Sequence, residues 1–259
     1  MSAADFVDDF GGPDLDTEVW VPHYLPQWSS RAQSAATCEV AGSELRLTIP
    51  PDHGLWCAGD HEPPLRVSGV QSGVFSGPAG STAGQQPYRD GLVVREPQPA
   101  RWGWTPRYGR IEVRARMELS PRSMAAVWMV GVEDVPERSA EICVFEVFGD
   151  ALAATDGRPT AAVGMGVHPF RDPAVADDFA AERLEIDVRA PHLYAADWRA
   201  GRVEFLVDDT VVRTVGQAPD YPMQMMVAVF DFPAKADAGP AGHVPLLAVD
   251  RVAGPPSAL

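Results

Sequence analysis

The sequence predicts an all-β fold, and three observations support this prediction. The chain has 259 residues, enough for one large core, and β-sandwiches of this length are commonly one domain. Its 23 glycines and 25 prolines are spread along the chain, which is typical of tight turns between short strands. Between them, stretches recur in which apolar and polar residues alternate, as in strands with one buried face. We therefore expect one β-sandwich domain over residues 1–259.

Several segments show these patterns in detail. Residues 109–119 form the clearest strand, because Ile, Val, Ala and Met alternate there with Glu and Arg. Residues 203–212 are predicted as a hairpin with an acidic turn at Asp208 and Asp209. Residues 223–232 are nearly all apolar, as expected for an inner strand covered on both faces. Residues 174–184 are helix-compatible but allow about three turns at most, so we expect a loop segment there.

Charge and hydropathy exclude some classes of partner. Lys and Arg number 21 against 36 Asp and Glu, which gives a formal charge of −15. This field repels nucleic acid and anionic membrane surfaces but not neutral sugars. No apolar run approaches the roughly 20 residues of a membrane helix, and residues 1–10 lack the basic and apolar regions of a signal peptide. We predict no nucleic-acid or membrane partner, and either a protein that stays inside the cell or one whose export segment has been removed.

The three cysteines are Cys38, Cys57 and Cys143. They show no Cys-x-x-Cys spacing, so neither a zinc knuckle nor a thioredoxin-type motif is predicted. Two interpretations of Cys38 and Cys57 stay open: they pair in an exported protein, or they are two small buried apolar residues.

Residues 140–149, Ala-Glu-Ile-Cys-Val-Phe-Glu-Val-Phe-Gly, place two carboxylates in an apolar stretch typical of a core strand. Glu141 and Cys143 share one face of a regular strand, whereas Glu146, five positions after Glu141, points to the other. A β-bulge, which adds one residue, would return Glu146 to the face of Glu141. Retaining glycosidases need two carboxyl groups about 5 Å apart. The spacing therefore indicates either a bulged catalytic strand or a charged strand edge.

The wider sequence resembles glycoside hydrolase family 16, whose hallmark is Glu-(Ile/Leu)-Asp-x-x-Glu on a bulged strand of a jelly roll. Residues 108–116 resemble the family's strand before the active site, and residues 126–129 resemble its Pro-Ala-x-Trp-Met stretch. Residues 192–198 are similar to its His-x-Tyr-x-x-x-Trp segment. Further similarities lie at the Val207-Asp208 hairpin, Pro222-Met223 and residues 249–252.

The resemblance implies a jelly roll of two antiparallel sheets with a concave carbohydrate-binding cleft. It implies that Glu141 is the nucleophile and Glu146 the general acid/base of a retaining endo-glycosidase, with no cofactor for catalysis. The implied substrate is a polysaccharide or oligosaccharide with β-1,3 or mixed β-1,3/1,4 linkages. The family also implies an extracellular protein, and we expect a monomer.

Four further side chains are candidates for substrate binding. By resemblance, Trp128 lines the cleft and His168 lies near the leaving group, although a strand Trp can be core and a lone His can be structural. Trp102 and Trp104 precede the strand at residues 109–119. They either form an outer sugar platform or cover the sandwich.

The sequence departs from the family pattern at two cleft positions. Cys143 stands where the family has its central Asp, so Glu146 loses a neighbouring negative charge that raises its pKa, and Glu141 loses an orienting hydrogen bond. Cys143 is not expected to act as a nucleophile itself, because two flanking carboxylates disfavour a thiolate. Ala228 stands where many relatives have Asn. By resemblance, Asp9 and Asp250 are candidate ligands of a structural calcium ion, or else ordinary surface acids.

The alternative to an enzyme is a carbohydrate-binding, lectin-like protein that keeps the cleft but has little or no turnover, as Cys143 suggests. A polysaccharide lyase on the same fold ranks last. It would need a Tyr/His/Arg cluster beside a uronate, and the negative charge of the chain disfavours that substrate.

Overall fold

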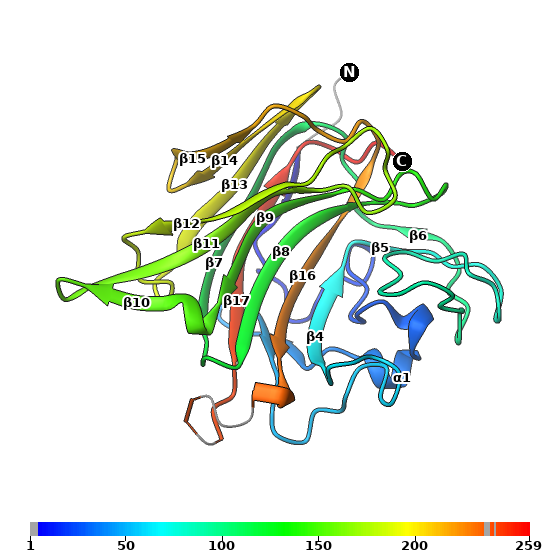
Figure 1. The fold of residues 1–259 in the computed structure, drawn as a ribbon, viewed down its shortest axis with the longest axis horizontal. Helices are drawn as coiled ribbons and strands as arrows, with labels where there is room; N and C mark the ends of the chain where they lie inside the picture. Colours follow the sequence, from blue (N-terminus) through cyan, green and yellow to red (C-terminus); the bar gives the residue numbers. More distant parts are fainter. Residues whose placement is uncertain (1–4, 236–238, 241) are drawn as a thin grey trace.

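Two large antiparallel sheets face each other in a computed structural model that describes residues 5–235, 239–240 and 242–259 (Figure 1). The prediction that residues 1–10 lack signal-peptide features includes residues 1–4, which lie outside the described residues. The first sheet has the strand order β15-β14-β13-β7-β17-β3-β2, and β1 pairs with β17. Its bounds are β1 Phe6–Asp8, β2 Cys38–Val40, β3 Leu45–Thr48, β7 Gly109–Glu118, β13 His192–Arg199, β14 Arg202–Val207, β15 Thr210–Val215 and β17 Leu246–Gly254.

The second sheet has the order β10-β11-β9-β8-β16-β4, and β12 pairs with β11. Its bounds are β4 Arg66–Gln71, β8 Ser123–Gly131, β9 Glu141–Phe148, β10 Leu152–Thr155, β11 Arg158–His168, β12 Asp178–Leu184 and β16 Met223–Asp231. A short pair, β5 Gly73–Val74 and β6 Arg101–Trp102, lies to one side, with one four-residue helix, α1 Arg31–Ser34. This architecture confirms the predicted all-β jelly-roll sandwich. None of the described helices is long and apolar enough to cross a membrane. That residues 1–259 form a single domain stays a prediction.

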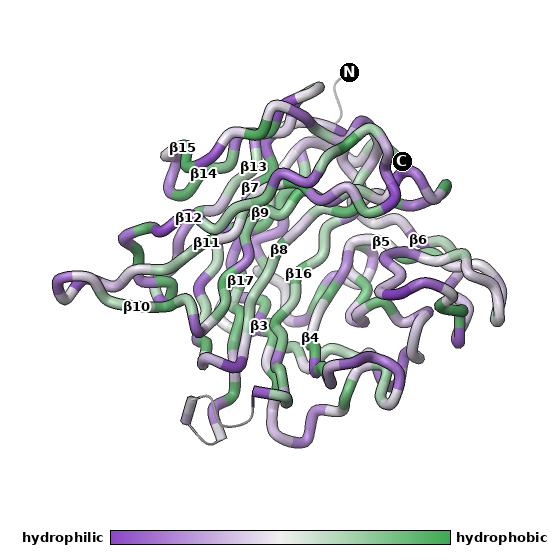
Figure 2. The backbone as a smooth tube through the Cα atoms, in the orientation of Figure 1, coloured by the Kyte–Doolittle hydropathy of each residue, from purple (hydrophilic) through white to green (hydrophobic). Residues whose placement is uncertain are grey.

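The main core lies between the two sheets. Strand β7 turns its apolar residues inward, and its charged residues face outward, where Arg116 pairs with Glu44 and Arg114 with Asp250. This confirms the alternation expected for residues 109–119. Apolar colour follows the central strands in Figure 2, whereas polar colour concentrates in loops and at the outer edges.

A second apolar cluster covers the opposite face of the β8-β9-β16 region. Leu25, Trp28, Trp56, Leu65 and Leu92, from loops before and after β4, pack there against side chains of these strands. Every residue of β16 is therefore buried, as expected for an inner strand covered on both faces. The loops that complete this cluster also form the walls of the cavity described below.

The predicted hairpin and the predicted loop segment had different outcomes. The hairpin is confirmed as β14 and β15, with Asp208 and Asp209 both at positive φ (48° and 61°) in the turn. The loop prediction for residues 174–184 is wrong for β12, because Asp178–Leu184 pairs along its full length with β11. Its Ala and Glu residues favour strands weakly, so pairing with a neighbouring strand overrides their local preference.

Candidate active site

Strand β9 carries a β-bulge at the predicted place. On β8, Val127 pairs with Phe145 but the next residue, Trp128, pairs with Cys143, so Val144 is the additional residue on β9. The pairing with β11 shifts at the same point. Glu141, Cys143 and Glu146 consequently lie on one face of the sheet, while Val144 and Phe145 belong to the core between the sheets. The bulge expected from the five-residue spacing is confirmed.

Gly166 of β11 lies opposite the bulge, paired with Cys143, at a φ of +152°. A Cβ atom there would lie 2.2 Å from the backbone oxygen of Asp178 on β12. We expect Gly166→Ala to lower the free energy of unfolding by about 3 kcal/mol, because backbone cannot move aside as a flexible side chain can. Gly157→Ala is the control, since its Cβ meets no atom within 4 Å. It should cost only about 1 kcal/mol for its positive φ. Equal losses in urea unfolding would contradict a specific constraint at the bulge.

The thiol of Cys143 lies between the two carboxylates. Its Sγ atom is 3.9 Å from Oε2 of Glu141 and 3.9 Å from Oε1 of Glu146. Cys143 is fully buried, Glu141 is 7% exposed, and Glu146 is half-buried. The three side chains thus form one cluster, in which the thiol is the most deeply buried group.

The two glutamates line a cavity of about 500 Å³, a volume suited to a small-molecule or sugar ligand. Apart from the acids, the walls are mainly aromatic, and aromatic faces pack well against the apolar faces of pyranose rings. The wall residues come from five loops and from strands β8, β9 and β16, and include Tyr24, Trp56, Tyr88, Trp128, Phe148, Phe170, Phe230 and Phe232.

Trp128 lies in the cavity wall, where the sequence placed it, at 6% exposure. Trp104 does not: it is 1% exposed, stacks on Phe6 and donates its Nε1–H to the Pro255 carbonyl at 2.8 Å. The platform interpretation is wrong for Trp104, which covers the end of the sandwich. Trp102 is half-buried against Gly73 on the small β5-β6 pair and does not line the cavity either.

His168 lies beside the cluster at the end of β11, paired in register with Glu141. Its Nδ1 atom is 2.6 Å from Oδ1 of Asp177, and its ring stacks on Phe179 at a centroid distance of 4.8 Å. His168 is not part of the cavity wall itself.

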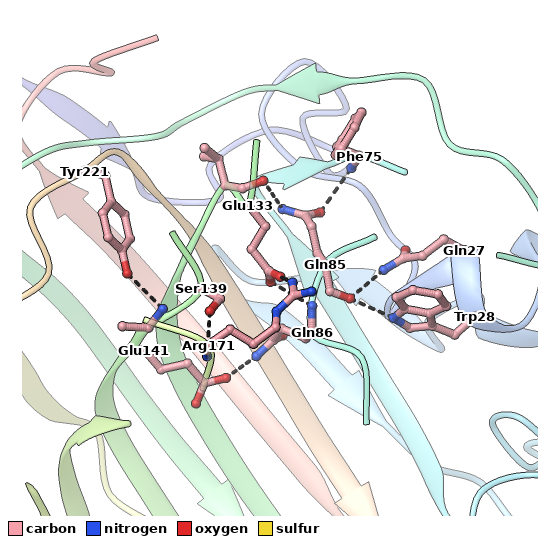
Figure 3. Close-up of polar contacts among 12 residues, drawn as sticks. Gln27, Trp28, Phe75, Gln85, Gln86, Glu133, Ser139, Glu141, Arg171 and Tyr221 are labelled. Carbon is pink, nitrogen blue, oxygen red and sulfur yellow. Dashed lines mark hydrogen bonds and ion pairs between the residues drawn. The ribbon is translucent and has the colours of Figure 1, made fainter. Parts of the chain in front are cut away.

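Gln86 contacts Glu141 from the long loop between β5 and β6 (Figure 3). Its side-chain amide donates a hydrogen bond to Oε1 of Glu141, and its backbone N–H donates to Oε1 of Glu133 at 2.7 Å. Arg171 forms an ion pair with the same Glu133 side chain, which is 1% exposed. Gln86 and Glu133 both adopt positive φ angles (46° and 55°), and such strained backbone needs surrounding contacts to hold it.

Gln85 anchors this loop to the rest of the protein. Its side chain accepts a hydrogen bond from the Phe75 N–H and donates one to the Val132 carbonyl, and its own carbonyl accepts from Gln27 and Trp28. Gln85 is completely buried, so the loop enters the cavity as a fixed element. The roles of Gln85, Gln86 and Glu133 could not be predicted from the sequence, because a loop has no periodic pattern to mark its functional residues.

Burial is the largest cause of the raised pKa values of Glu141 and Glu146. Burial raises the pKa of Glu141 well above its usual value, and the carboxylates of Glu146 and Glu133 raise it further, while hydrogen bonds from Cys143 and Gln86 oppose the increase. Burial also raises the pKa of Glu146, against the opposing effect of His168. The pair is therefore suited to holding a proton at a pH above the usual pKa of a carboxyl group.

The Cys143 thiol stays protonated for the same reason. Burial raises its pKa well above the usual value, and the charges of Glu141 and Glu146 add to the increase. The expectation that Cys143 is a poor nucleophile agrees with this environment. Cys38 and Cys57 are both free, so the structure favours the interpretation of two small apolar residues over a disulfide.

The two candidate calcium ligands lie near the paired strands β1 and β17, and each already has a partner. Asp250 forms an ion pair with Arg114 at 2.6 Å, and Asp9 accepts the N–H of Gly11 at 3.1 Å. Oδ1 of Asp250 is buried and has no hydrogen-bond partner among the residues that the structure describes. Calcium binding at this position stays a prediction.

A comparison with protein-family models identifies the chain. Residues 104–245, more than half of the sequence, match the model of the glycosyl hydrolases family 16, and this range includes the bulged strand. The chain belongs to glycosyl hydrolases family 16. The resemblance inferred from the sequence motifs is thereby confirmed, and the chain is assigned to a family of glycoside hydrolases.

Solved structures of three glycoside hydrolases share the fold. A GlcNAcα1-4Gal-releasing endo-β-galactosidase from Clostridium perfringens has a TM-score of 0.79 at 23% identity over 96% of this chain, which spans 62% of that protein. SCLam, a non-specific endo-β-1,3(4)-glucanase from family GH16, has a TM-score of 0.63 at 16% identity, covering 98% of this chain and 93% of that one. A laminarinase catalytic domain from Thermotoga petrophila has a TM-score of 0.62 at 12% identity, covering 100% and 98%. The comparison with curated proteins gave no match.

Proposed function

We propose that this family 16 protein is a retaining endo-glycosidase that cleaves a β-linked polysaccharide, with Glu141 as nucleophile and Glu146 as general acid/base. The observation that carries the proposal is the bulge, which puts both carboxylates on one face, in the wall of one aromatic cavity. Two carboxyl groups on one side of a sugar-sized space are what a double displacement requires.

The reaction would proceed in two steps. In the first, Glu141 attacks the anomeric carbon while Glu146 gives its proton to the leaving oxygen. In the second, Glu146 removes a proton from water, which then displaces Glu141 and restores the anomeric configuration. The raised pKa of Glu146 favours its role as the acid. Glu141 must be ionised to attack, and the hydrogen bond from Gln86 favours the ionised form.

We propose a β-1,3 or mixed β-1,3/1,4 glucan as the substrate. The aromatic walls suit a chain of pyranose rings, and two structural neighbours are named as β-glucanases. Laminarin, lichenan, agarose, carrageenan and a β-galactoside polymer should be incubated with the protein while new reducing ends are followed. Cleavage of laminarin or lichenan supports the proposal. Cleavage of the galactosides alone would retain the mechanism but overturn the glucan assignment, and no product from any polymer would count against the enzyme.

Gln86 is proposed as a positioning residue that supplies the orienting hydrogen bond expected from the missing Asp. We expect Gln86→Leu to lower kcat about 10- to 100-fold, as for a lost hydrogen bond to a charged group. The pKa of Glu141 should rise further, because the lost donor stabilised the charged form. The acidic limb of the kcat/KM profile should therefore move to higher pH. Gln33→Leu, on an exposed turn of α1, is the control. A lower kcat with an unmoved pH limb would indicate a merely structural role.

A lectin-like protein is the second candidate, because the weak donor Cys143 contacts both acids at 3.9 Å. This candidate predicts oligosaccharide binding without cleavage, measured by calorimetry and by reducing-end release. Cys143→Asp should then raise the rate from near zero. If the natural protein already cleaves the polymer rapidly, or if Cys143→Asp stays inert, the lectin candidate with a lost Asp fails.

A further inference from the structure

Three side chains with metal-binding atoms converge beside the proposed acid/base. Cys143 and Glu146 lie on β9 and His168 at the end of β11, and one ligand-type atom of each lies within 4.8 Å of those of the other two. Within the described part of the chain, no other His, Cys, Asp or Glu side chains form such a group. The bulge creates this convergence, because it returns Glu146 to the face of Cys143.

The contact of His168 with Asp177 favours the tautomer that metal ligands need. Oδ1 of Asp177 lies 2.6 Å from the Nδ1 atom of His168, and a carboxylate accepts hydrogen bonds. In the neutral imidazole this places the proton on Nδ1 and leaves the lone pair of Nε2 for a metal ion. A carboxylate behind an imidazole is the usual outer partner of a metal-bound histidine, and the stacking of His168 on Phe179 fixes the ring further.

The chemistry of the three ligand atoms determines which class of metal ion the site prefers. A thiol sulfur, an imidazole nitrogen and one carboxylate favour zinc and similar cations, whereas calcium and magnesium prefer oxygen ligands alone. Zinc bond lengths put tetrahedral ligand atoms roughly 3.3–3.8 Å apart. The Cys143–Glu146 distance of 3.9 Å is close to this range. The three ligand atoms lie within 4.8 Å of one another, so they must approach by about 1 Å when an ion binds.

The surrounding charges favour a cation. Glu141 lies 3.9 Å from the Cys143 sulfur, Asp177 stands behind His168, and the whole chain carries a formal charge of −15. Arg171, the cation of the neighbouring network, is already paired with Glu133. An ion could enter from solvent between Glu146 and His168, since the His168 side chain is 29% exposed.

We propose that Cys143, Glu146 and His168 form a binding site for zinc or a similar divalent transition metal, and that an ion bound there inhibits the glycosidase. On binding, the Cys143 S–H bond breaks, its proton leaves to solvent and a sulfur–metal bond forms. The metal also binds the carboxylate of Glu146, whose proton leaves to solvent as well, so that this group can no longer donate a proton to a leaving oxygen. The inhibition rests on the proposed function, whereas the binding does not.

Cobalt(II) is the probe for binding, because a cobalt–thiolate bond gives a near-ultraviolet charge-transfer band. We expect this band, with release of a proton, in the natural protein and in Cys38→Ser, which removes a thiol on the other sheet. Cys143→Ser should lack the band. No band in the natural protein, or the same band in Cys143→Ser, would overturn the proposal.

Asp177→Asn provides a second test that leaves all three ligands in place. Loss of this outer carboxylate should weaken cobalt and zinc binding about 10- to 100-fold. Unchanged affinity would contradict the assigned role of His168.

If the protein cleaves a polysaccharide, zinc should inhibit it and calcium should not, and Cys143→Ser should be less sensitive to zinc. A cobalt band in a protein without glycosidase activity would support the site and overturn only the inhibition. An active enzyme without the band would overturn the site and leave the proposed function intact.

Discussion

Glu141→Gln is expected to lower kcat on the preferred polysaccharide by about 10⁴-fold or more, because a neutral amide cannot attack the anomeric carbon. The change is nearly isosteric, and the new side chain can still accept the hydrogen bond from Gln86. Glu137→Gln, at an exposed position four residues earlier, is the matched control and should keep full activity. A Glu141→Gln protein that retains a tenth of the natural kcat would exclude Glu141 as the nucleophile.

The same variant should not be less stable than the natural protein. Burial raises the pKa of Glu141, so this side chain costs folding free energy, and the cost grows as the pH rises from the ordinary pKa of a glutamate to the raised pKa. A neutral Gln avoids it. We expect the thermal midpoint of Glu141→Gln to equal or exceed that of the natural protein at pH 7. Loss of activity with an unchanged midpoint then reports chemistry rather than unfolding.

Glu146→Ala is expected to lower kcat on a polysaccharide by about 10²- to 10⁴-fold, the usual contribution of a general acid/base. With an aryl glycoside whose leaving group needs no proton, the rate of the first step, attack by Glu141, should fall much less. Azide, a small anion that attacks without a general base, should restore turnover and form a glycosyl azide of retained configuration. Glu137→Ala is the control, and it should respond to azide as the natural protein does. An equal loss with both leaving groups, or no rescue, would contradict the acid/base role of Glu146.

Much of the fold follows from local pattern. The alternation in β7, the acidic turn between β14 and β15, and the apolar run of β16 each predict the observed element, because each pattern reflects burial on one or both faces. The bulge also follows, since carboxylates five positions apart share a face only if one residue is added. Strand β12 was missed because its edge pairing with β11, not its composition, makes it a strand.

The candidate site was only partly predictable, because some of its contacts depend on tertiary structure and not on local sequence pattern. Glu141 and Glu146 lie on the bulged strand β9 and Trp128 on its neighbour β8, so motif and spacing place them in the cavity. Gln86 reaches Glu141 from a loop 55 positions away in sequence, and no local pattern encodes that contact. Trp104 is a case that the sequence left open: a Trp near the active-site strands either forms a sugar platform or covers the sandwich, and its stacking on Phe6 shows that it covers the sandwich.

We propose that the bulged strand β9 presents Glu141 as the attacking carboxylate. To test this, Glu146→Ala should be treated with an activated 2-fluoro glycoside of the preferred sugar, digested, and searched for the label by mass spectrometry. We expect one glycosyl group, in ester linkage to Glu141. A label on Cys143 or on another residue would contradict this proposal, and so would product of inverted configuration released without any covalent intermediate.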